Sequence, residues 1–220
     1  IRTPALEDTN LFIRATGEAS DIANKEIYSF NDRNDKSIAL RPEGTASVIR
    51  SIIEKKLDQS PHKIWYMGPM WRYERPQKGR YRQFYQAGVE VLGYEEGHPE
   101  FEMISLVCSI IEEFNLDGCC IKINHLGTQD SKEAFCKSLV EYLTPFKNNL
   151  DPKDCERLLK NPLKVLDSKN IETQAILKNA PSIKDFLEPS SIELLEAIKQ
   201  QFEDICMIEI DYSLVRGLDY

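Results

Sequence analysis

The chain has 220 residues, of which 41% are apolar and 29% charged, and this composition is typical of a soluble globular protein. No apolar run approaches the ~18–20 residues of a membrane span. The net charge of −8 argues against a general nucleic-acid-binding surface. Six cysteines without a CxxC pair argue against a zinc ribbon or a disulfide framework, and they favour reduced thiols and a cytoplasmic location.

The first part of the chain mixes short strands and helices. A strand is expected over 37–40, followed by the turn Arg41-Pro42-Glu43-Gly44. A helix over 45–57 comes next, with apolar residues at helical spacing and Thr45 placed to cap it. The same spacing predicts another helix over 98–114.

Residues 64–74 and 81–92 predict the two strands of an antiparallel hairpin, because turn residues separate two extended patterns. Side chains alternate between the faces of a strand. One face of the second strand is therefore apolar and is the expected core face, comprising Tyr81, Tyr85, Ala87, Val89 and Val91. The other face is polar in detail and carries Arg82, Phe84, Gln86, Gly88 and Glu90.

Three features of this polar face favour a binding site over a solvated surface. Phe84 is an aromatic ring at a position flanked by charged residues, where a solvated face would not favour it. Gly88 weakens a strand interior, and such a glycine often marks the close approach of a ligand. Gln86 and Glu90 flank it and could grip a small polar molecule. Glu43, in the turn before the first helix, is interpreted either as part of a salt-bridged, capped turn or as a carboxylate that holds an ammonium group.

A basic loop joins the two hairpin strands. Residues 72–82 carry five basic residues and one acid, within a chain that is acidic overall. Such an island suggests a focused anion site, such as one for a nucleotide phosphate, although a solvated hairpin tip is the simpler reading.

The last part of the chain predicts helices, then a strand. Residues 128–205 are mainly helical, highly charged and punctuated by prolines. Ser190 and Glu193 form a capping-box pattern before the last helix. Alternating apolar residues over 206–212 predict a strand. The expected fold is α+β: a mainly antiparallel sheet flanked by helices (1–127), a helical insertion (128–205), and a return to the core (206–220).

Three segments together resemble the histidyl-tRNA synthetase family of class II aminoacyl-tRNA synthetases. GPMWRYERPQKGRYRQFYQAGVEVLG (68–93) is similar to motif 2 of the family, LRPEGTA (40–46) to its histidine-site turn, and LVRGLDY (214–220) to its first histidine signature. NPLKVLDSKN (161–170) resembles its insertion domain. The resemblance implies the class II catalytic core, but motif 1, motif 3 and the anticodon-binding domain are not found, so this piece alone is expected to be inactive.

The resemblance implies ATP-binding roles for four hairpin residues. Arg72 corresponds to an arginine that contacts the α-phosphate, and Glu74 to a carboxylate at the adenine amino group. Arg80 corresponds to a loop arginine near the terminal phosphates, and Phe84 to a ring under the adenine. ATP is thus the expected second substrate, with Mg²⁺, and no protein side chain is identified as a metal ligand.

The resemblance also implies a histidine site. The residues that correspond to positions holding the α-amino group are Glu43, Thr45 and Gln86. Glu90 corresponds to the carboxylate facing the imidazole, and Tyr220 to the rim of that pocket. Arg216 corresponds to an arginine that binds histidine and stabilises the reacting carboxylate and α-phosphate. Arg72 and Arg216 are therefore the expected catalytic residues, because two fixed guanidinium groups can neutralise charge where one anion attacks another.

Three functions are compatible with these patterns. The favoured one is ATP-dependent activation of L-histidine and its transfer to tRNA(His) by a cytoplasmic enzyme that is a homodimer at full length. A histidine-sensing regulatory paralogue of the synthetase without aminoacylation is the alternative, and a non-catalytic tRNA-binding or interaction module built on the insertion is a third. The complete set of motif 2 residues favours ATP use over sensing, and the acidity of the insertion weakens the RNA-binding reading.

Overall fold

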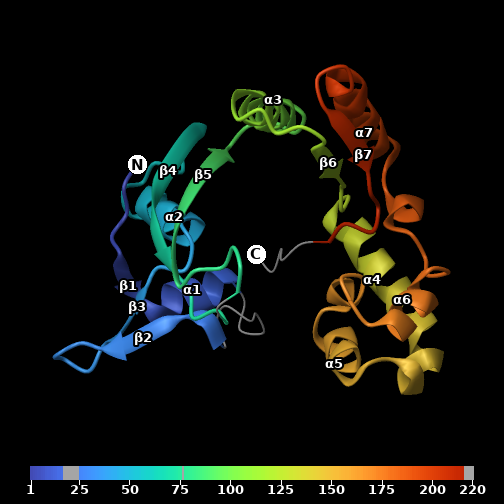
Figure 1. The fold of residues 1–220 in the computed structure, drawn as a ribbon, viewed down its shortest axis with the longest axis horizontal. Coiled ribbons are helices and arrows are strands. Elements are labelled where there is room, and N and C mark those ends of the chain that lie inside the picture. The colour runs from blue at the N-terminus through green and yellow to red at the C-terminus, as the bar shows by residue number, and fades with distance from the viewer. Residues whose placement is uncertain (17–24, 76, 216–220) are drawn as a thin grey trace. The chain divides into compact units, whose positions relative to one another are not determined.

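The structure is a computed structural model that describes residues 1–16, 25–75 and 77–215. The chain divides into two compact units, one formed by residues 1–95 and the other beginning at Glu96 (Figure 1). Each unit has its own core. Helices and strands occur in both units, and this confirms the predicted α+β class. The boundaries expected at 127/128 and 205/206 stay predictions.

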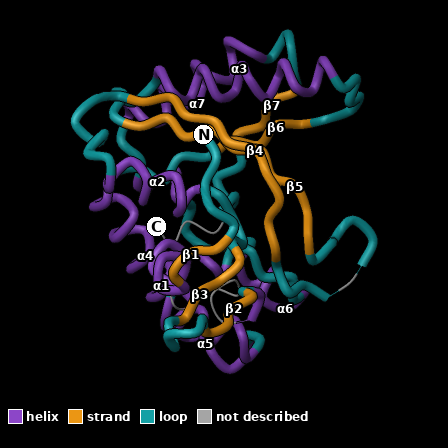
Figure 2. The backbone as a smooth tube through the Cα atoms, turned by 90° about the vertical axis from the view of Figure 1, so that its left-hand side faces the viewer, coloured by secondary structure: helices purple, strands orange, loops and turns teal. Residues whose placement is uncertain are grey.

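The first unit consists of a small sheet, a long hairpin and two helices. Its elements are β1 (Leu6–Asp8), α1 (Thr9–Thr16), β2 (Tyr28–Asn31), β3 (Ser37–Leu40), α2 (Thr45–Glu54), β4 (His62–Trp71) and β5 (Gln83–Leu92). Antiparallel strands in the order β1-β3-β2 form the sheet, and β4 and β5 form the hairpin (Figure 2). The predicted strand 37–40, the helix from residue 45 and the antiparallel hairpin are confirmed, although α2 ends three residues before the predicted end.

The predicted core face of the hairpin is wrong. Tyr85 is 73% exposed, and Trp65 on the same face of β4 is 67% exposed. The covered face is the one with Phe84, because Tyr66 and Met70 of β4 lie on that face and pack into one cluster with two residues of α2, Val48 and Ile52. Alternation along β5 separates the two faces, but the packing of α2 against β4 decides which face is covered.

The second unit consists mainly of helices around a two-stranded parallel sheet. Its elements are α3 (His98–Glu113), β6 (Cys120–Ile123), α4 (Gln129–Leu143), the 3-10 helix η2 (Thr144–Asn149), α5 (Pro152–Lys160), η3 (Pro162–Val165), α6 (Ile171–Leu177), η4 (Ile183–Phe186), α7 (Pro189–Phe202) and β7 (Met207–Ile210). β6 and β7 pair in parallel. The predicted helix at 98–114 and strand within 206–212 are confirmed.

Two clusters of buried residues form the core of this unit. Ile123 and Ile208 of the strands pack with Cys108, Leu195 and Phe202. The other cluster joins α4 to α5 and η4 and includes the buried residues Phe135, Leu139, Leu143, Leu158 and Ile183. No helix among the described residues is long and apolar enough to cross a membrane.

The predicted capping box before α7 is wrong. The helix begins at Pro189, with Glu188 as N-cap, so Ser190 lies within the first turn. Proline suits the first helical position because its missing N–H would have no partner there. Instead, Glu188 links the starts of two helices: its Oε1 accepts hydrogen bonds from Thr128 Oγ1 and Ser131 Oγ, each 2.7 Å long. These bonds, first that of Ser131, lower the pKa of Glu188 from 4.5 to about 2.

Glu188 is expected to make the stability of this unit depend on acid pH. Because the pKa is lowered in the folded state, its contribution is complete above about pH 4.5 and is lost as the pH falls toward about 2. The midpoint of thermal unfolding, followed by circular dichroism from pH 7 to pH 2, should therefore fall more steeply for the parent than for Glu188→Gln. Glu196→Gln, an exposed change on the same helix, should follow the parent. Equal slopes for the parent and Glu188→Gln would contradict this prediction.

Candidate functional site

The turn between β3 and α2 and the covered face of β5 bring three of the predicted histidine-site residues together. Thr45 Oγ1 donates a hydrogen bond of 2.7 Å to Glu90 Oε1. Glu43 is buried, and its two carboxylate oxygens accept from the main-chain N–H groups of Thr45 (2.6 Å) and Ala46 (3.0 Å). Thr45 is therefore not the cap of α2 as predicted. Glu43 satisfies the first N–H groups of the helix, and this leaves the Thr45 hydroxyl available for Glu90.

The space above Gly88 is filled by the protein itself. A Cβ atom at Gly88 would lie 2.2 Å from the Tyr66 side chain, and one at Gly44 would lie 2.1 Å from the same ring. The predicted close approach at Gly88 is thus that of Tyr66, its cross-strand partner, and not a ligand. Tyr66 has its hydroxyl oxygen 3.5 Å from Thr45 Oγ1, so the ring closes the floor of the site beneath the Thr45–Glu90 pair.

Gln86 lies on the same face of β5, opposite Gly68. Its side-chain oxygen is buried and has no hydrogen-bond partner among the described residues. An unpaired buried acceptor costs free energy until a donor reaches it. An ammonium group is a donor of the kind that this oxygen and the Glu43 carboxylate can accept.

The residues assigned to ATP lie at the other end of the hairpin. Arg72 Nε donates to the Pro42 carbonyl oxygen at 2.8 Å, and its guanidinium carbon lies 5.2 Å from the centre of the Phe84 ring. Glu74 and Arg80 form an ion pair with each other, with Arg80 Nη1 3.2 Å from Glu74 Oε2. Two of the four residues assigned to ATP therefore contact each other here, and the Arg80 side chain stays 58% exposed.

Arg41 is a residue of this site to which the sequence patterns assign no role. It is only 7% exposed, and burial lowers the pKa of its guanidinium. Its side chain donates to the carbonyl oxygens of Thr3 (2.6 Å) and Pro69 (3.0 Å). Arginine is rarely buried, so a buried arginine points to a specific role. The sequence gives little warning of this burial, because the only apolar neighbours of Arg41 in the chain are Leu40 and Pro42.

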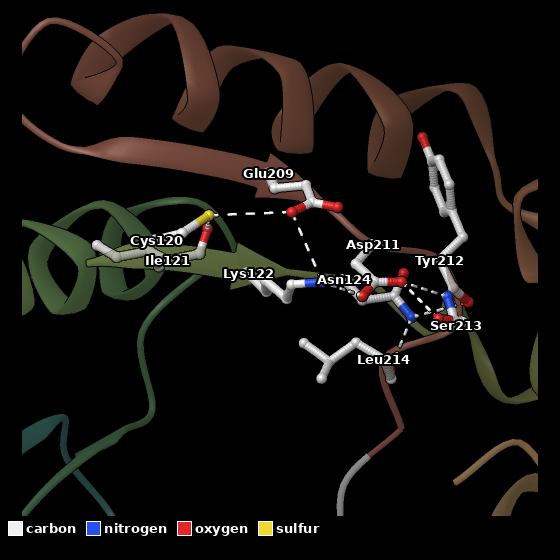
Figure 3. Close-up of polar contacts among 9 residues, drawn as sticks. All are labelled: Cys120, Ile121, Lys122, Asn124, Glu209, Asp211, Tyr212, Ser213 and Leu214. Carbon is white, nitrogen blue, oxygen red and sulfur yellow. Dashed lines mark hydrogen bonds and ion pairs between the residues drawn. The ribbon is translucent and has the colours of Figure 1, made fainter. Parts of the chain in front are cut away.

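The second unit contains the residues that lead into LVRGLDY. Asn124 Nδ2 donates to the carbonyl oxygens of Leu214 (3.0 Å) and Tyr212 (3.5 Å), as Figure 3 shows. Asp211 accepts from Ser213 and from Lys122 Nζ (2.9 Å), and these bonds, first that of the Ser213 side chain, lower its pKa. Asn124 and Asp211 thus bind the chain at Tyr212, Ser213 and Leu214. Arg216 and Tyr220, both predicted for the histidine site, lie outside the described residues.

The described histidines and cysteines make no catalytic or metal-binding cluster. His125 Nε2 lies 2.7 Å from Glu96 Oε1, and its Nδ1 accepts from the Gly127 N–H. His62 lies 2.6 Å from the Leu57 carbonyl oxygen. The six cysteines are free. No group of three potential metal ligands occurs among the described residues.

Known proteins match the chain along its whole length. A family model described as Histidyl-tRNA synthetase matches residues 1–220. A histidine--tRNA ligase of Lactococcus lactis subsp. cremoris (strain SK11) is 47% identical over 225 residues, and one of Cyanothece sp. (strain PCC 7425) is 45% identical over 223. Both alignments cover 100% of this chain and 52% of the relative, so the chain spans about half the length of these relatives.

Solved structures agree with the sequence relatives. The chain matches apo histidyl-tRNA synthetase from S. aureus with a TM-score of 0.74 and 36% identity, over 100% of this chain and 50% of that one. A Bacillus halodurans protein titled ATP phosphoribosyltransferase regulatory subunit/histidyl-tRNA synthetase matches with a TM-score of 0.59 and 19% identity, over 61% of its length, and shows the fold alone. Together with the motif 2 hairpin and the turn that packs against it, these matches show that the chain belongs to the histidyl-tRNA synthetase family.

Proposed function

We propose that the full-length protein containing this chain activates L-histidine with ATP and transfers the histidyl group to tRNA(His). One observation carries the proposal. The five-residue turn from Arg41 to Thr45 contacts both the arginine assigned to the α-phosphate and the carboxylate assigned to the imidazole, through Arg72 Nε–Pro42 O and Thr45 Oγ1–Glu90 Oε1. The turn thus connects the residue proposed for the α-phosphate with the residue proposed for the imidazole.

In the proposed reaction a histidine carboxylate oxygen attacks the α-phosphorus of ATP, and the bond to the β-phosphate oxygen breaks to release pyrophosphate. Glu43 and the Gln86 oxygen hold the ammonium group, and Glu90 accepts a hydrogen bond from the imidazole N–H. Arg72 and Arg216 balance the negative charge that builds up on the α-phosphate. No side chain acts as a covalent nucleophile. ATP enters with Mg²⁺, which supplies charge neutralisation at the phosphates.

The regulatory alternative would use only some of the hairpin residues that are present in this chain. A histidine sensor needs Glu43, Thr45 and Glu90, but it has no use for an arginine that is oriented toward a phosphate. Arg72 is held at Nε by a carbonyl oxygen, and this arrangement suits an arginine whose terminal nitrogens bind a second group. A cytoplasmic location and a homodimer at full length are part of the proposal, and only the resemblance to the family supports them.

Amino-acid-dependent ATP–pyrophosphate exchange with the full-length protein tests the proposal. Exchange is expected with L-histidine and not with other amino acids, and charging of tRNA(His) transcripts should follow. Binding of histidine without exchange would favour the sensing paralogue. Exchange without tRNA charging would limit the function to the first step.

A further inference from the structure

Arg41 joins three segments of the first unit that are far apart in the sequence. Its Nη1 donates to Thr3 O (2.6 Å), Thr3 Oγ1 (3.0 Å) and Pro4 O (3.4 Å), and its Nε donates to Pro69 O (3.0 Å). Its Nη2 lies against β4, where a Cβ atom at Gly68 would be 2.5 Å away. One guanidinium group therefore connects the N-terminal segment, the end of β3 and the middle of β4.

The main chain of Arg41 reinforces these links. Its N–H donates to Ala5 O at 3.0 Å, and its carbonyl oxygen accepts from the N–H of Trp71 at 3.1 Å. The next carbonyl along the chain, that of Pro42, accepts from Arg72 Nε. The Arg41 carbonyl thus binds the main chain of Trp71, and the Pro42 carbonyl binds the side chain of Arg72.

The position of Pro42 decides how Arg72 is oriented. A guanidinium is a planar fork, and fixing its Nε sets the plane of both terminal nitrogens. The Phe84 ring supports the same group at 5.2 Å, but a ring face allows rotation and a directional hydrogen bond does not. If the Pro42 carbonyl moved, the charge of Arg72 would stay near the site, but its guanidinium group would no longer be held in one orientation.

We propose that Arg41 is a positioning residue for Arg72: by tying the 41–45 turn to Thr3 and Pro69, it holds the Pro42 carbonyl that orients the guanidinium of Arg72 for the transition state. The inference rests on the proposed function. The hydrogen bonds described for the Arg41 side chain go to the protein's own oxygen atoms, so it acts through Arg72 and not on the substrate. A lysine cannot replace it, because a single ammonium cannot reproduce the two-sided fork between Thr3 and Pro69.

The test uses the full-length protein and a double-mutant cycle. Arg41→Lys is expected to lower kcat for histidine-dependent pyrophosphate exchange about 10- to 50-fold, with KM for ATP and histidine within about threefold. In an Arg72→Ala background the same change should cost less than about threefold, because residues that act as one unit are not additive. Arg50→Lys is the matched control: Arg50 binds Glu7 and Glu54 in the same unit, and its loss should leave kcat within about twofold.

Three outcomes would overturn the inference. Multiplicative effects of Arg41→Lys and Arg72→Ala would show that Arg41 contributes independently of Arg72. An unchanged kcat in a folded Arg41→Lys protein would show that Arg41 does not position Arg72. Loss of the folded state in both Arg41→Lys and Arg41→Gln, monitored by near-UV circular dichroism, would make Arg41 a residue of the fold alone. Absence of exchange in the parent, in contrast, would refute the proposed function itself.

Discussion

Replacing Arg72 by alanine in the full-length protein is expected to lower the rate of histidyl-adenylate formation by about 10²–10³-fold, which corresponds to about 2.7–4 kcal/mol of transition-state stabilisation. Attack of a carboxylate on a phosphate brings negative charge onto the oxygen atoms around the α-phosphorus. Arg72 is held by Pro42 O and lies over the Phe84 ring, so its guanidinium needs little reorganisation when that charge develops. ATP affinity should fall by less than about tenfold, since the β- and γ-phosphates retain their own contacts.

Single-turnover measurements at saturating histidine and ATP isolate this chemical step from product release. Arg33→Ala is the control from the same unit, because Arg33 is exposed and lies between β2 and β3, outside the segments assigned to either substrate. It should react within about threefold of the parent. If Arg72→Ala did the same, the α-phosphate would be bound elsewhere and the assignment of the hairpin would be wrong.

The sequence predicts the hairpin well because two local signals agree. Alternating side chains indicate strands, and the loop between them contains turn residues such as Gly79, which has a φ of 81°. Alternation does not show which of the two faces is buried and which is exposed. That depends on Val48 and Ile52 of α2, which cover the Tyr66 and Met70 side of β4. The helix was predicted, but its placement on one face of the hairpin is a tertiary property.

Gly88 and Thr45 show the same limit at the scale of single residues. The missing side chain at Gly88 indicates that some group comes close, but a strand sequence does not identify that group, which is Tyr66 and not the ligand expected. Thr45 was expected to cap α2 because threonine is a good cap. Glu43 takes that role with both carboxylate oxygens, and only the folded turn reveals this exchange.

Arg41 leaves no signal in the sequence for a different reason. Its partners are the carbonyl oxygens of Thr3, Pro4 and Pro69. Every residue of a protein has such a main-chain oxygen, so the partners cannot be recognised by residue type. Side-chain motifs reveal interactions between distinctive residue types. An arginine that binds main-chain oxygen atoms leaves no second residue in the pattern to find.

Glu90 is expected to set the specificity for histidine, and Glu90→Ala in the full-length protein should lower kcat/KM for histidine by at least ~10²-fold, about 2.7 kcal/mol. One carboxylate oxygen, Oε1, accepts from Thr45 Oγ1, and this bond restricts the rotation of the carboxylate. The other oxygen then has a defined direction in which to accept from an imidazole N–H. An apolar or acidic amino acid would leave this carboxylate unpaired or repelled, and sites built on hydrogen bonds reject such analogues strongly.

The exchange assay with varied histidine, and ATP binding measured without histidine, separate specificity from general damage. ATP affinity should stay within a few-fold in Glu90→Ala. Glu95→Ala, an exposed change just beyond β5, should stay within about twofold of the parent in kcat/KM. Thr45→Val supplies a further test: without the hydroxyl the carboxylate is free to rotate, so the variant should lose histidine affinity in the same direction as Glu90→Ala but by less. If Glu90→Ala activated histidine as the parent does, the imidazole would be recognised by another group, and the Thr45–Glu90 bond would serve only to pack α2 against β5.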